Sequence, residues 1–298
     1  MIDSVLNDIK STFRSGNMIS RLILINIGVF VIFALLKAFD PSSASPDGVF
    51  QTVRNLFALI SDPWTLLKHP WTLFTHMFLH VGFWHILWNM LLLFWFGRIV
   101  GDLLGDRRIL PLYILGGLFG GLIFILWDQF LPGGSGGLRP ALGASAAVMC
   151  MLWVAATTAP DYSIHLILIG PVKLKYVALA ILFMDILRSA GDVNTGGHFA
   201  HIGGAVFGML YTYALRNGTD LTEAFSIFSR KEKQYTKVKK TSRKKFKVVH
   251  SASQSDKAAK PVSSQQEELD RILEKITDKG YENLTDEEKE FLYQASKK

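Results

Sequence analysis

Cysteine is almost absent from this 298-residue sequence, and its scarcity excludes whole classes of site. The one cysteine, Cys150, permits neither an intramolecular disulfide nor a CxxC metal site, and we expect it to pack as a small apolar residue. There is also no glycine-rich phosphate-binding loop and no internal repeat. No small-residue cleavage site follows the first apolar run, so we do not expect a cleavable signal peptide.

Hydrophobic residues make up 49% of the chain, and nearly all long apolar runs fall between residues 22 and 215. A helix that crosses a membrane needs about 20 apolar residues. Six segments approach this length: 22–39, 80–98, 109–130, 144–160, 174–190 and 198–215. The sequence therefore predicts an all-α membrane protein, a bundle of six transmembrane helices.

Basic residues gather on one side of this bundle. Between Arg216 and His250 there are 11 Lys and Arg against 3 Asp and Glu. Because Lys and Arg accumulate in cytoplasmic loops, we expect both termini in the cytoplasm and the protein in a bacterial inner (plasma) membrane. The basic excess also suits contact with anionic lipid headgroups. It follows a span directly and lacks interleaved aromatic residues, so we expect no nucleic-acid partner.

Four regions are expected along the chain. Residues 1–20 place apolar side chains at helical spacing, which predicts a cytoplasmic interfacial helix. Residues 21–216 hold the six spans, and residues 217–266 form a basic, flexible linker. Residues 267–298 form a small helical element, in which Thr285 and Glu288 have the spacing of a capping box.

Polar residues interrupt three of the apolar segments, and such residues in membrane helices are functional candidates by default. Ser145 begins the fourth segment, His85 and Asn89 lie one turn apart in the second, and His201 lies near the start of the sixth. At a rise of about 1.5 Å per residue, Ser145, His85 and His201 lie roughly 24, 20 and 22 Å from the charged inner ends of their segments. This common depth predicts a shared site, although a small residue such as Ser145 also suits close helix packing.

The residue types in this set fit acyl transfer. A serine becomes nucleophilic when a neighbouring histidine takes its proton, which pairs Ser145 with His201. His85, Asn89 and the Ser145 backbone amide have the N–H groups that an oxyanion hole requires. An asparagine such as Asn89, taken alone, is more often an interhelical hydrogen-bonding residue. No acid is needed to complete a triad.

The remaining polar residues near this set have plainer interpretations. Asp185 and Asp192 are candidates for a triad acid, but we expect them to lie solvated at the outer end of the fifth segment. His198 is expected to be a boundary residue. Histidines at 69, 76, 80 and 85 are also close in sequence, but they straddle a loop and a helix start with no carboxylate nearby, so we expect no metal.

Three motifs, in this order on alternate segments, resemble the rhomboid family of intramembrane serine proteases. The HxxxN motif of that family matches His85 and Asn89, and its serine motif GxSG corresponds to "GASA", with Gly143 and Ser145. Its AHxxG motif matches "AHIGG", which assigns the base to His201. The small residues Gly204 and Gly208 would let the serine and histidine helices touch.

The resemblance implies cleavage of single-pass transmembrane proteins near the outer membrane interface by a Ser–His dyad, without a metal or cofactor. In place of a metal-binding role, we expect His80 to brace the first loop or the oxyanion side. Three positions differ from the family pattern: Ala146 replaces a glycine, Met149 replaces an aromatic residue and Thr72 replaces an arginine. The alternative function is a proteolytically silent rhomboid-like protein that binds or escorts transmembrane clients.

Overall fold

The computed structural model describes residues 2–137, 139–166, 169–189, 195–228, 264–279 and 281–295. The chain divides into two compact units, Met1–Gln234 and Tyr235–Lys298, and each is described by itself. Most of the basic segment predicted at 217–266 lies outside the described residues, as does Asp192.

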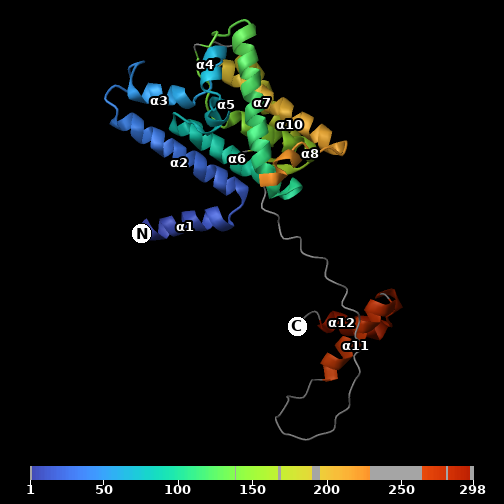
Figure 1. Cartoon of the computed structure of the whole chain (residues 1–298). Helices are drawn as coiled ribbons and strands as arrows, with labels where there is room; N and C mark the ends of the chain where they lie inside the picture. The colour runs from blue at the N-terminus through green and yellow to red at the C-terminus, as the bar shows by residue number, and fades with distance from the viewer. Residues whose placement is uncertain are drawn as a thin grey trace. The chain divides into compact units, whose positions relative to one another are not determined.

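Six helices in the first unit fall on the six apolar segments of the sequence (Figure 1). They are α2 (Met18–Phe39), α6 (Phe83–Leu104), α7 (Ile109–Phe130), α8 (Ser145–Thr158), α9 (Leu174–Ser189) and α10 (Thr195–Arg216). Within the described part of the chain, three stretches are long and apolar enough to cross a membrane: Met18–Phe39, Phe83–Leu104 and Asp106–Phe130. The protein is thus a mostly helical membrane protein.

Shorter elements connect these helices. The long first connection holds α3 (Val49–Phe57), α4 (Pro63–Lys68), α5 (Thr72–Thr75) and the 3-10 turn η1 (His76–Phe78). The others are α1 (Ile2–Ser15), η2 (Asp106–Arg108) and η3 (Glu223–Phe228).

One feature departs from the all-α prediction. Strands β1 (Ser163–Leu166) and β2 (Gly170–Lys173) form an antiparallel hairpin, in which Ser163 pairs with Lys173 and Leu166 with Gly170. The hairpin follows α8, which ends at Thr158 because Pro160 disfavours helical geometry at the preceding residue.

Helix α8 is the centre of the first unit. It contacts α6, α7, α9 and α10, whereas α2 lies alongside α6 at the edge of the unit (Figure 1). Every residue from Ala146 to Ala156 is buried, and the 14 residues of α8 span only about 21 Å. The outer helices instead expose large apolar side chains such as Ile32 and Phe183, as expected for a surface that faces lipid.

Small residues allow α10 to approach α8 at main-chain distance. A Cβ atom at Gly204 would clash with the Ala146 carbonyl oxygen, and one at Gly208 would lie 2.7 Å from the Cys150 carbonyl oxygen. A Cβ at Gly120 of α7 would clash with the Ala146 side chain. Three helices therefore meet around the residue that follows Ser145, in the manner of small-residue contacts between membrane helices.

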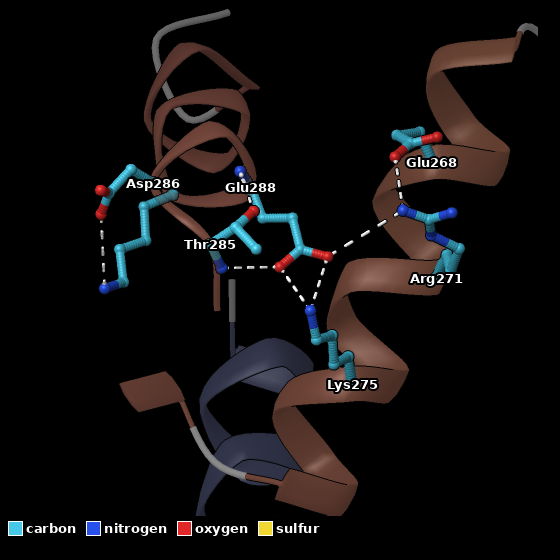
Figure 2. Close-up of polar contacts among 7 residues, drawn as sticks. Glu268, Arg271, Lys275, Thr285, Asp286 and Glu288 are labelled. Carbon is cyan, nitrogen blue, oxygen red and sulfur yellow. Dashed lines mark hydrogen bonds and ion pairs between the residues drawn. The ribbon is translucent and has the colours of Figure 1, made fainter. Parts of the chain in front are cut away.

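The second unit contains α11 (Ser264–Lys279), η4 (Tyr281–Asn283) and α12 (Asp286–Ala295). Figure 2 shows Lys275 of α11 paired with Glu288 of α12, at 2.6 Å. Glu288 also accepts a hydrogen bond from the Thr285 backbone N–H at 2.8 Å, while the Thr285 hydroxyl accepts one from the Glu288 N–H at 3.4 Å. This is the reciprocal capping box that the sequence predicted, and the same carboxylate that caps α12 joins it to α11.

Candidate active site

A cavity of about 760 Å³ lies among α6, α7, α8 and α10. The residues that line it include His85 and Asn89 of α6, Ser145 at the start of α8 and His201 of α10. Gly143 and Ala146, on either side of the serine motif, line it as well. The structure thus brings the serine, its predicted base and the predicted oxyanion residues together around one cavity.

Ser145 occupies the first turn of α8, where backbone N–H groups have no partner within the helix. Gly143, two residues earlier, has a φ of 122°, a conformation that residues with a side chain rarely adopt. A Cβ atom there would also lie only 2.7 Å from Nε2 of His85. The glycine therefore lets the His85 ring lie directly against the backbone that leads into Ser145.

Two histidines of the first loop hold this backbone in place. The Gly143 N–H donates to the His76 carbonyl oxygen at 2.9 Å, and the Ala144 N–H donates to Nε2 of His80 at 3.3 Å. His80 lies before α6, not within it as the predicted segment 80–98 implied, and its ring lies 5.0 Å from that of His85. His80 therefore braces the serine loop, and the contribution of His76 was not foreseen from the sequence.

Burial keeps both loop histidines neutral. It lowers the pKa of His76 to about 4 and that of His80 to about 3, from an ordinary value of 6.5. A neutral His80 can accept the Ala144 N–H through Nε2, which an imidazolium could not do. Protonation would therefore disrupt the loop that leads into Ser145.

These two histidines predict a loss of stability on mild acidification. In the unfolded chain both histidines take up a proton below about pH 6.5. In the folded protein His76 does so only near pH 4 and His80 only near pH 3. Stability is therefore retained above pH 6.5 and decreases as the pH falls toward 4. We expect the dependence of melting temperature on pH to flatten in His76→Asn combined with His80→Gln, since these amides take up no proton. An unchanged dependence in the double variant would contradict the assignment.

His201 is held from its far side by a carboxylate. Its Nδ1 lies 2.9 Å from Oδ1 of Asp185 in α9, and Nδ1 of His198 lies 2.7 Å from the same oxygen. Asp185 is only 6% exposed, so the prediction of a solvated aspartate is wrong. His198, which was expected at the boundary of the sixth segment, is itself buried at 8% exposure. Asp185 points inward because of the rotation of α9 about its own axis, which depth along the chain does not reveal. The rule that a charged residue in an apolar segment is a functional candidate would have retained it.

Comparisons with known proteins match this arrangement. The rhomboid domain family matches residues 67–218, just over half of the chain. The chain belongs to the rhomboid family. The match covers α6 to α10 and every residue of the candidate site, whereas residues 260–298 match a family of unknown function (DUF6576).

Relatives of this rhomboid protein are similar over nearly half of the chain. RHOMBOID-like protein 12, mitochondrial, of Arabidopsis thaliana is 29% identical over 47% of the chain and 45% of its own length. Rhomboid protein 1, mitochondrial, of Saccharomyces cerevisiae is 32% identical over 48% of the chain and 41% of its own. Presenilin-associated rhomboid-like protein, mitochondrial, of Homo sapiens is 26% identical over 45% and 35%. The chain thus aligns with less than half of the length of each of these relatives.

The names of these relatives contradict the predicted location. All three are named as mitochondrial proteins, so the prediction of a bacterial inner membrane is wrong. Basic loops indicate which side of a membrane a terminus occupies but not which membrane it is. The assignment of both termini to the cytoplasm came from the basic loops; it was part of the same prediction of location and is not retained.

The structure shows the contacts of the three residues that depart from the rhomboid pattern. Ala146 has helical backbone geometry and is buried against Gly120 and Gly204. Met149, one turn after Ser145, lines a smaller cavity together with His201 and Asp185. Thr72 is buried, and its hydroxyl donates to the His69 carbonyl oxygen at 2.8 Å, while its own carbonyl lies 2.9 Å from Nδ1 of His76. Hydrogen bonds from Thr72 and His76 thus order the loop in which the family has an arginine.

Asp185, His198 and His201 are also arranged as a group that could hold a metal, since one ligand atom from each lies within 4.8 Å of the others. Both imidazoles, however, direct Nδ1 to a single carboxylate oxygen at 2.7 and 2.9 Å. These are lengths of charge-assisted hydrogen bonds. The donor atoms are thereby engaged with one another, and we describe the three side chains as a hydrogen-bonded cluster.

Proposed function

We propose that this rhomboid protein is an intramembrane serine endopeptidase that cleaves single-pass transmembrane proteins near a membrane interface. The observation that carries the proposal is the common cavity of Ser145 and His201, with Nδ1 of His201 turned to Asp185. This hydrogen bond leaves Nε2 of His201 to accept a proton. The proposal includes six membrane-crossing helices surrounded by lipid, of which α8 would be the short, central one.

The proposed reaction has two halves. Nε2 of His201 takes the proton of the Ser145 hydroxyl while Oγ bonds to the carbonyl carbon of the scissile peptide. The tetrahedral oxyanion is stabilised by N–H groups, and His201 then gives its proton to the leaving amine as the C–N bond breaks. Water repeats the sequence on the acyl-enzyme, which releases the second product and restores Ser145.

The oxyanion donors in this proposal are His85, Asn89 and the Ser145 backbone N–H. One N–H of the Asn89 side chain already donates to the His85 carbonyl oxygen at 2.8 Å, and an amide carries a second. We expect His85→Ala and Asn89→Ala each to lower kcat by about 10- to 1,000-fold, the effect of losing one oxyanion donor. The measurement is steady-state cleavage of a transmembrane substrate in detergent. An unchanged kcat in both variants would leave these residues with a packing role.

Labelling with a fluorophosphonate probe tests the proposed function, because such probes react only with activated serines. We expect the full-length protein to be labelled, Ser145→Ala to remain unlabelled, and the exposed-strand control Ser163→Ala to be labelled as the natural protein is. Absence of labelling in the natural protein, with no cleavage of transmembrane substrates, would favour the alternative of a silent client-binding rhomboid protein.

A further inference from the structure

We propose that Asp185 is a positioning residue for His201 and that His198 fixes this carboxylate in its working position. The inference rests on the proposed function, because it concerns how the base of that reaction is prepared. It adds a third and a fourth side chain to the Ser145–His201 pair. Both come from positions that the motifs of the sequence did not assign to catalysis.

The hydrogen-bond pattern fixes the proton positions. An ionised carboxylate only accepts hydrogen bonds, so each imidazole that contacts Oδ1 of Asp185 carries its proton on Nδ1. In a neutral His201 this leaves Nε2 unprotonated, which is the form that can accept the Ser145 proton. His198 and His201 lie three residues apart on α10, hence on one face of the helix, so a single carboxylate reaches both.

The same contact would act during the reaction. When Nε2 of His201 takes the serine proton, the ring becomes a cation next to a buried carboxylate, and attraction between the two is strong where water is excluded. Among the described residues, Oδ2 of Asp185 has no hydrogen-bond partner. The support of this carboxylate by the described side chains therefore comes from the two imidazoles, and His198 remains as a fixed donor while His201 gains and loses protons.

A purely structural role does not account for this placement. A charge in an apolar helix such as α9 is costly, and an apolar side chain of similar volume in place of a buried ion pair is often neutral or stabilising. Asp185 also connects α9 to the one histidine on which the proposed chemistry depends. The geometry therefore fits orientation of a base better than attachment of two helices.

Asp128 offers a matched control. It is a second buried aspartate, 2% exposed, at the end of α7. Its carboxylate accepts hydrogen bonds from the Ser61 hydroxyl, from the backbone and hydroxyl of Ser135, and from the Gly137 N–H. These contacts order the glycine-rich connection before α8. Replacing Asp128 thus removes a buried carboxylate without touching His201.

The experiment compares full-length Asp185→Asn, Asp185→Glu, Asp128→Asn and His198→Ala in detergent, with kcat/KM for a transmembrane substrate measured across pH. An asparagine can donate to Nδ1 and so favours the tautomer with its proton on Nε2, which cannot accept from serine. We expect Asp185→Asn to lower kcat by roughly 100- to 10,000-fold with KM within threefold, as when the orienting acid of a serine protease is neutralised. The acid limb of the pH profile, where kcat/KM declines on acidification, should move to lower pH in this variant. Asp185→Glu should be more active than Asp185→Asn, because it keeps a carboxylate.

The controls separate positioning from folding. Asp128→Asn is expected to lower the melting temperature and to leave the acid limb in place, and His198→Ala to cost about tenfold. This inference fails if Asp185→Asn keeps the acid limb of the pH profile in place and has a kcat within threefold of the natural protein. If Ser145→Ala and His201→Ala are inactive in the same experiment, the proposed function stands. If Ser145→Ala is itself active, the proposed function fails. Activity that is lost with EDTA and restored by Zn²⁺ would assign the cluster to a metal and overturn the inference.

Discussion

Ser145→Ala and His201→Ala are each expected to abolish cleavage of a transmembrane substrate, with kcat lowered by about 10⁴-fold or more. The two side chains line one cavity from separate helices, and in nucleophile–base pairs that act as a unit the loss of either partner costs nearly as much as the loss of both. Ser145→Ala combined with His201→Ala should therefore be no less active than either single variant. The measurement is single-turnover cleavage at matched amounts of folded protein.

The control for this pair is retention of the fold. Ser145 lies half-buried at a helix start and His201 lines a cavity, so neither substitution opens a closed core, and we expect melting temperatures within a few degrees of the natural protein. His198→Ala should lose much less activity than His201→Ala. Turnover near that of the natural protein in either dyad variant would show that the dyad is wrongly assigned.

Ala146→Leu is expected to inactivate the protein completely, whereas Ala146→Gly should stay within about tenfold of the natural activity. Ala146 is 4% exposed and lies where α7 and α10 approach α8 at Gly120 and Gly204. A leucine adds three carbons where a single Cβ on either glycine would already clash, and overpacking of this kind displaces backbone. The helical backbone at this position suits alanine, so glycine loses only helix propensity, about 1 kcal/mol.

Ala34→Leu on α2 is the matched control for that series, since Ala34 is exposed on a helix at the edge of the unit. We expect it to retain both activity and melting temperature. Activity and melting temperature are measured for all variants. Full activity in Ala146→Leu would mean that this residue does not border the working part of the cavity.

The sequence was sufficient to locate the main helices, because they follow from local properties of the chain. Apolar runs of the required length mark where α2, α6, α7 and α10 occur. The rise per residue predicted Ser145 and His201 at one level, and the two residues line one cavity. The capping box of Thr285 and Glu288 was equally local. Whether every one of the six apolar helices crosses a bilayer stays a prediction.

What the sequence did not provide depends on contacts between segments. Asp185 was expected at a solvated end, but the packing of α9 against α10 turns it toward His201. His76 acts on the serine loop through its backbone carbonyl, which no side-chain motif can signal. The β1–β2 hairpin forms in the connection between α8 and α9, and its pairing is likewise a contact between segments.

The glycine contacts between α8 and α10 have a consequence for how the cavity can adapt. At Gly204 and Gly208 the two helices that carry Ser145 and His201 approach at main-chain distance, so at these two positions no long side chain of α10 separates them. Their spacing is set by atomic radii and cannot be adjusted by repacking. The α6 wall of the same cavity differs, because the exposed rings of Trp84 and Trp88 line it and side-chain rotation there can change its width.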